Sequence, residues 1–89
     1  MIEIQVRLFG AFRKYETDQA LISLKIPELS SIEGVKNSIA SHFKERFKDF
    51  SDEALIKDSA IADERRVLEA NTLIERSCTL AILPPVCGG

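Results

Sequence analysis

The chain has 89 residues, of which 45% are hydrophobic and 29% charged, and its net charge is −2. This length supports one domain with a modest core, and the slight acidity argues against nucleic acid as a partner, because nucleic-acid-binding domains normally carry a basic face. No apolar run approaches the roughly 20 residues of a membrane span, and the N-terminus lacks the pattern of a signal peptide. We therefore expect a cytoplasmic protein with no membrane partner.

The first third of the chain has the pattern of two strands. Residues 2–9 alternate between apolar and polar side chains until Phe9, which is the period of a half-buried strand. Residues 10–18 predict a turn or a short helical connection. A second alternating run then places Ile22, Leu24 and Ile26 on one face and stops at Pro27.

The middle of the chain predicts one long amphipathic helix. Ser30 and Glu33 fit a capping box with Ser30 as the N-cap, and the helix should run to about Lys48. Its apolar stripe consists of Ile32, Val35, Ile39, Phe43 and Phe47. His42 lies at the edge of this stripe. Since the chain has no second histidine, we interpret His42 as a partly buried boundary residue rather than a metal ligand or catalytic base.

Shorter elements are expected after the helix. Residues 50–58 fit a short helical piece and residues 59–62 a strand. Asp63 and Glu64 would then form a turn, with residues 65–68 as the returning strand, although this pair is a poor substitute for the Asn-Gly that two-residue hairpins prefer.

A tight connection over residues 72–77 leads into the last strand, residues 78–83. One face of this strand carries Cys78, Leu80 and Ile82, and the other carries Thr79, Ala81 and Leu83. The order of elements predicts an α+β fold, a mixed sheet with one main helix packed across one face.

The residues after the last strand have an unusual composition. Neither the last strand nor the tail carries a charged side chain. Pro84 and Pro85 favour an extended backbone, and Gly88 and Gly89 lack a Cβ, so a narrow slot could admit this backbone with the terminal carboxylate leading. We therefore divide the chain into a domain, residues 1–83, and a tail, residues 84–89.

A terminal carboxylate becomes an acyl donor only after adenylation or a similar activating step. The sequence has no phosphate-binding loop, no metal-ligand cluster and a single histidine. We expect this chain to bind no cofactor and no metal of its own, with ATP used by another protein that activates the carboxylate.

The two ends of the chain resemble a known family. Residues 79–89, the last strand and Pro-Pro-Val-Cys-Gly-Gly, resemble the C-terminus of the small, sulfur-carrying subunit of molybdopterin synthase, and residues 2–13 resemble its first strand and turn. The resemblance spans nearly the whole chain. It implies a β-grasp, ubiquitin-like fold in which the first and last strands form the central parallel pair. Residues 63–66 and 72–77 depart from the turn residues common in the family.

The resemblance also implies a mechanism. An adenylating enzyme of the ubiquitin-activating kind would activate the Gly89 carboxylate, and a sulfur donor protein with a persulfide would convert it to a thiocarboxylate. The large subunit of molybdopterin synthase would use this sulfur on cyclic pyranopterin monophosphate and supply the acid-base groups. The chain itself would be a non-catalytic carrier, in which Gly89 holds the sulfur, Gly88 allows a slim approach, and Pro84 and Pro85 direct the tail ahead of Val86.

Two apolar side chains near the tail suggest a docking surface. If the first and last strands are neighbours, Phe9 and Leu83 lie on the face away from the helix, with Ala81 on the same face. The resemblance implies that the large subunit docks there. The alternative is that these are ordinary surface side chains, or that they are buried under a loop.

The cysteines, Cys78 and Cys87, are too few for a disulfide scaffold, and we expect both to be reduced. Cys87 could hold a persulfide, form a transient disulfide with the activating enzyme or attack the activated Gly89. No neighbouring cation in the sequence would stabilise its thiolate, so we interpret it as a tolerated small residue. Cys78 is expected to face the core and to be inert.

Three other functions stay open at this point. The chain could be a sulfur carrier for another pathway such as thiamine synthesis, which the Pro-Pro-Val before the last three residues argues against. It could be a protein modifier joined to lysines through Gly89, which would give ladders of conjugates. It could be a plain binding module with an incidental Gly-Gly end, whose activity would survive deletion of Gly89.

Overall fold

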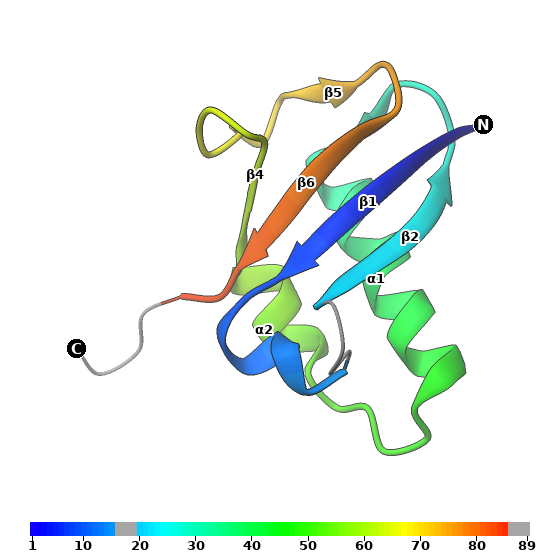
Figure 1. The fold of residues 1–89 in the computed structure, drawn as a ribbon, viewed down its shortest axis with the longest axis vertical. Coiled ribbons are helices and arrows are strands. Elements are labelled where there is room, and N and C mark those ends of the chain that lie inside the picture. The colour runs from blue at the N-terminus through cyan, green and yellow to red at the C-terminus, as the bar shows by residue number, and fades with distance from the viewer. Residues whose placement is uncertain (16–19, 86–89) are drawn as a thin grey trace.

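One long helix packs across one face of a four-stranded mixed sheet (Figure 1). The structure, a computed structural model, describes residues 1–15 and 20–85. The strands are β1 (Ile2–Leu8), β2 (Leu21–Ile26), β3 (Ser30–Ser31), β4 (Ala60–Ala62), β5 (Leu73–Ile74) and β6 (Cys78–Leu83). The helices are α1 (Ile32–Arg46), α2 (Glu53–Asp58) and a 3-10 helix, η1 (Gly10–Tyr15).

The strand order in the main sheet is β2-β1-β6-β4. β1 pairs antiparallel with β2 and parallel with β6, and β4 pairs antiparallel with β6. Figure 1 shows β1 and β6 side by side in the middle of the sheet. The prediction of a central parallel pair formed by the first and last strands is therefore confirmed. β3 and β5 form a separate two-stranded sheet.

Period-2 alternation in the strands and the stripe of α1 together build the core. The inward side chains of β1 are Ile4, Val6 and Leu8, all buried, and α1 buries Ile32, Val35, Ile39 and Phe43 against the sheet. Full burial of one such side chain stabilises the fold by about 1.5–3 kcal/mol, so this interface holds β1 and β6 in place. The two N-terminal strands and the helical stripe from Ile32 to Phe43 are confirmed, whereas Phe47, predicted as part of the stripe, is the C-cap that follows the helix and packs against the core.

The start of α1 differs from the prediction. Ser31, not Ser30, is the N-cap: its backbone is extended and its Oγ accepts a hydrogen bond of 3.0 Å from the N–H of Gly34. Ser30 pairs with Ile74 in the small sheet and donates its hydroxyl to the Pro27 carbonyl instead. The predicted capping box was wrong: both serines lie in β3, but the Ser30 hydroxyl bonds back to Pro27, and it is the Ser31 hydroxyl that reaches the first turn of the helix. The helix also ends at Arg46, two residues before the predicted Lys48.

The two serines offer a direct test of this assignment. Ser31→Ala should lower the free energy of unfolding by about 1 kcal/mol, because the N–H of Gly34 loses its acceptor. Ser30→Ala is the matched control, and it should cost less because it removes a single hydroxyl donor at the edge of a two-residue strand. Urea denaturation of the two variants measures the difference, and a larger loss for Ser30→Ala would restore the original assignment.

Two connections in the second half of the chain also differ. Residues 65–68 were predicted as a returning strand, but only Val67 forms an isolated bridge, to Ala62. Asp63 accepts hydrogen bonds from the N–H groups of Arg65 and Arg66, at 2.7 and 2.9 Å, and these close a compact turn in place of a regular hairpin. The predicted tight connection over residues 72–77 contains β5. The short helix and the strand before this turn are confirmed as α2 and β4.

Candidate functional site

The root of the tail is held by the centre of the sheet. β6 is paired on both sides. At its C-terminal end, Ile82 is paired with Leu8 of β1, and Leu83 is paired with Ala60 of β4. Pro84 and Pro85 follow, and because proline has no N–H they cannot extend the ladder. The chain therefore leaves the sheet at a fixed point next to the end of β1 (Figure 1). The other tail residues named from the sequence, Val86, Cys87, Gly88 and Gly89, lie outside the described residues.

The predicted docking residues lie on the face of the sheet away from α1. Phe9 follows the buried Leu8 and is 42% exposed. Ala81 and Leu83 alternate with the buried Leu80 and Ile82, and both are half-buried. We call Phe9, Ala81 and Leu83 the docking patch. The structure brings these three side chains to the end of the sheet from which the tail leaves, and binding of a partner there stays a prediction.

The structure adds neighbours to the docking patch that the sequence pattern missed. Ala60 is paired with Leu83, and both Leu21 and Ala81 lie opposite Arg7 in the strand register. All of these side chains share the outer face because directly opposed residues in adjacent strands point the same way. The pairing register, which the sequence alone does not show, was the missing information.

A pocket of about 290 Å³ adjoins the docking patch where β1 ends and β2 begins. Its lining residues are Arg7, Leu8, Phe9, Arg13, Ala20 and Leu21. Two guanidinium groups beside an exposed phenylalanine suit a partner surface that combines an apolar side chain with an acidic one, since arginine pairs with carboxylates in a two-point geometry.

The connection that contains Phe9 and Gly10 is held against the protein core by two aromatic side chains of η1. Phe12 of η1 is fully buried, and the Tyr15 ring stacks on Phe43 of α1 with centroids 4.4 Å apart. The Tyr15 hydroxyl donates a hydrogen bond to the Asp52 carboxylate. Burial, and then this hydrogen bond and the charge of Asp52, raise the pKa of Tyr15 above its usual range. Phe12 and Tyr15 thus hold η1 against the core and α1.

Cys78 matches the interpretation of an unreactive thiol. It is half-buried at the start of β6 and packs against the core. Burial, with the negative charge of Asp63 as the smaller cause, raises the pKa of the Cys78 thiol. Since the thiolate is the nucleophile, this environment lowers the reactivity of Cys78 at neutral pH.

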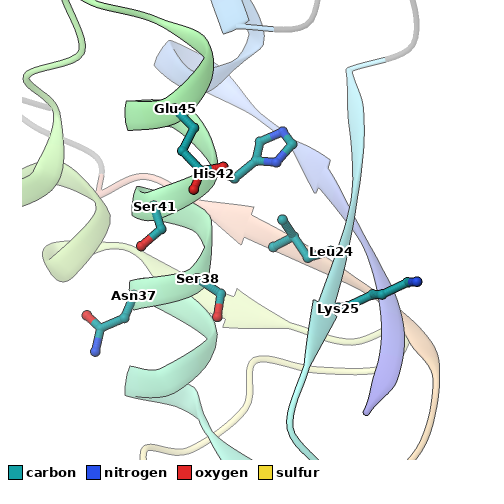
Figure 2. Close-up of a pocket in the computed structure, with 7 residues that line it drawn as sticks. All are labelled: Leu24, Lys25, Asn37, Ser38, Ser41, His42 and Glu45. Carbon is teal, nitrogen blue, oxygen red and sulfur yellow. The ribbon is translucent and has the colours of Figure 1, made fainter.

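A second pocket, of about 320 Å³, lies between α1 and β2 (Figure 2). The helix contributes Asn37, Ser38, Ser41, His42 and Glu45, and the strand contributes Leu24 and Lys25. Figure 2 shows His42 extending from α1 toward β2 and Lys25 pointing away from the helix. His42 is half-buried, as the sequence predicted, and its ring lies edge-on to Phe43 with centroids 5.8 Å apart. β1 separates this polar groove from β6, so it is not part of the tail root.

Two features are absent from the part of the chain that the structure describes. No three side chains of His, Cys, Asp or Glu in residues 1–15 and 20–85 gather as they would around a metal ion. In the same part of the chain, no helix is long and apolar enough to cross a membrane. The described residues form a folded domain in which Pro84 and Pro85 follow the central strand β6 beside an apolar and basic surface.

No protein-family model matches the sequence, and no curated protein matches it either. Solved structures do match. A Pyrococcus furiosus protein assigned as subunit 1 of molybdopterin converting factor matches with a TM-score of 0.67 and 20% sequence identity. The match covers 97% of this chain and 100% of that chain. Small archaeal modifier protein 1 from Haloferax volcanii has a TM-score of 0.68 and 11% identity, covering 97% and 100%.

A chain from the complex of subunits 1 and 2 of molybdopterin-converting factor from Helicobacter pylori matches with a TM-score of 0.55 and 21% identity, covering 99% and 100%. Ubiquitin and another ubiquitin-fold protein are among the further matches. The chain has a ubiquitin-like β-grasp fold. This confirms the predicted fold class, and the β-grasp neighbours include the proteins to which the sequence resemblance pointed. Identities of this size establish the β-grasp fold and nothing finer.

Proposed function

We propose that this β-grasp protein is a sulfur carrier, and within that class the small subunit of molybdopterin synthase. The main support is the ending Pro-Pro-Val-Cys-Gly-Gly, residues 84–89, placed directly after the central strand β6 of a ubiquitin-like fold. The structural likeness to subunit 1 of molybdopterin converting factor supports the same assignment. The proposal includes that Gly89 ends the mature chain and holds the sulfur as a thiocarboxylate.

Sulfur loading takes place in the active site of an activating enzyme and has three steps. The Gly89 carboxylate attacks the α-phosphate of ATP in an activating enzyme, which releases pyrophosphate and gives an acyl-adenylate. The persulfide of a sulfur donor attacks the acyl carbon, and AMP leaves. A second thiol then reduces the resulting acyl disulfide and releases the thiocarboxylate. The sequence has no phosphate-binding loop, which is why ATP belongs to the partner.

Sulfur delivery requires docking on the large subunit. In the proposal the docking patch binds that subunit and the tail enters its pocket. There the thiocarboxylate sulfur displaces an oxygen leaving group of cyclic pyranopterin monophosphate to form a thioester, and water then hydrolyses this thioester, which leaves the sulfur on the pterin and returns the Gly89 carboxylate. The complex of subunits 1 and 2 from Helicobacter pylori supports a partner of this kind. A carrier of this type would work in the cytoplasm, where its thiols stay reduced.

A second candidate is a protein modifier, favoured by the likeness to small archaeal modifier protein 1. A modifier uses the same activated Gly89 but transfers the chain to an amine, with the lysine nitrogen displacing AMP or a thiol. Immunoblots of cell extract separate the two roles, because a modifier gives a ladder of heavier conjugates and a carrier gives one free species.

The decisive experiment is sulfur loading followed by intact-mass spectrometry. Purified protein whose mass shows Gly89 to be its last residue is incubated with an adenylating enzyme from the same cells, ATP and a persulfide donor. We expect the mass to rise by the difference between sulfur and oxygen, with fragment ions locating the change at Gly89. An unchanged mass, when the same enzyme adenylates another carrier, would contradict the proposal.

A further inference from the structure

Gly10 and Pro84 touch at the root of the tail. Gly10 has a backbone φ of +59°, a conformation that favours glycine. A Cβ added to Gly10 would lie 2.7 Å from Cγ, 3.5 Å from Cδ and 3.9 Å from Cβ of Pro84. The first distance is shorter than any normal carbon contact. The pyrrolidine ring therefore occupies the space that a side chain at position 10 would fill.

This contact follows from the parallel pairing of β1 and β6. Leu8 and Ile82 are the last paired residues of the two strands, and Gly10 and Pro84 each come two positions later. Pro84 has no N–H with which to continue the ladder. Packing against the Gly10 backbone thus takes over from hydrogen bonding at the point where the tail leaves the sheet.

Gly10 is the less movable of the two partners. The N–H of Leu8 donates to the Ala20 carbonyl at 2.7 Å, and the N–H of Phe12 donates to the Phe9 carbonyl at 3.2 Å. Phe12 itself is fully buried. A side chain at position 10 would therefore displace Pro84, which is half-buried and followed by the tail, rather than move η1 out of the core.

We propose that Gly10 is a positioning residue for the reaction at Gly89: its missing side chain seats Pro84 and so sets the direction in which the tail leaves the globule. The inference rests on the proposed function. A misdirected tail would leave the surface that binds the activating enzyme unchanged, but its carboxylate would reach the activating site less often. The expected signature is a lower kcat for sulfur loading with an unchanged KM for the carrier.

The test is a double-mutant cycle in the loading reaction. Gly10→Ala should lower kcat by about tenfold to a hundredfold, since a misplacement of about 1 Å can cost that much. In a Pro84→Ala background, which lacks the clashing Cγ, the same substitution should lower kcat by less than about threefold, because the strain of the left-handed backbone acts on folding stability rather than on kcat. Gly34→Ala is the matched glycine control, because its Cβ would meet only Ser31 Oγ at 3.4 Å and Ser30 Cβ at 3.8 Å.

Three outcomes would overturn the inference: normal loading of Gly10→Ala, an equal effect of Gly10→Ala in both backgrounds, or a change in KM alone. If Gly10→Ala does not fold, Pro84→Ala is compared with Pro85→Ala, and equal loading rates of these two variants would also overturn it. A nuclear Overhauser contact between the Gly10 Hα and Pro84 Hγ protons is expected in the unmodified protein. If that contact is present but no activating enzyme loads the wild type, the proposed function fails while the packing stands.

Discussion

One alanine added after Gly89 is expected to reduce sulfur transfer to the pterin precursor by at least about a hundredfold. An extended residue lengthens the chain by about 3.5 Å, and a misplacement of only about 1 Å can cost a hundredfold in rate. The added methyl group also fails to fit a slot that admits bare backbone. Transfer is measured as conversion of the precursor by the large subunit, with the extended carrier supplied as a chemically prepared thiocarboxylate so that activation does not limit the rate.

The matched control carries the same alanine before Met1. Met1 is 81% exposed, and β1 runs parallel to β6, so its start lies at the opposite end of the sheet from the tail root. This variant should transfer sulfur at the normal rate. A C-terminally extended carrier that is equally active would show that the position of the terminal carbonyl does not matter, and the carrier proposal would fail.

The sheet and the main helix could be predicted from sequence because each shows a regular spacing of apolar residues within its own segment. The alternation of Ile4, Val6 and Leu8 and the stripe from Ile32 to Phe43 specify which side faces the core, whatever the rest of the chain does. The start of α1 could not be predicted in the same way. Two adjacent serines are equally good caps locally, and both pair with β5. What separates them is the partner of each hydroxyl, which is Pro27 for Ser30 and Gly34 for Ser31.

The candidate site likewise contains residues that the local sequence identifies and residues that depend on the strand register. The tail residues could be named as candidates because their composition is unusual in itself. Phe9 was found because it breaks the polar face of an alternating strand. Gly10, by contrast, was expected only as a turn residue, because its contact with Pro84 depends on the parallel register of β1 and β6. Ala60 and Leu21 were missed for the same reason, since small and apolar residues have no special meaning until their neighbours across the sheet are known.

Leu83→Asp is expected to weaken binding to the large subunit by about 30-fold to 1,000-fold, which corresponds to about 2–4 kcal/mol at a central interface residue. Leu83 lies on the outer face of β6, beside Ala60 and next to the point where the tail leaves. An aspartate there would place an unpaired charge in the middle of the apolar contact, and burying it without a partner is costly. Phe9→Asp should have an effect of similar size.

Leu73→Asp is the control for a general effect of exchanging a surface leucine for aspartate. Leu73 is 50% exposed, but it belongs to β5 in the separate small sheet, away from the tail root (Figure 1). Its variant should bind the large subunit normally in isothermal titration calorimetry, while circular dichroism confirms that all three variants stay folded. Because Leu83 and Phe9 are partly solvent-exposed, their loss should reduce affinity far more than stability. Equal affinities for Leu73→Asp and Leu83→Asp would place the partner surface elsewhere on the protein.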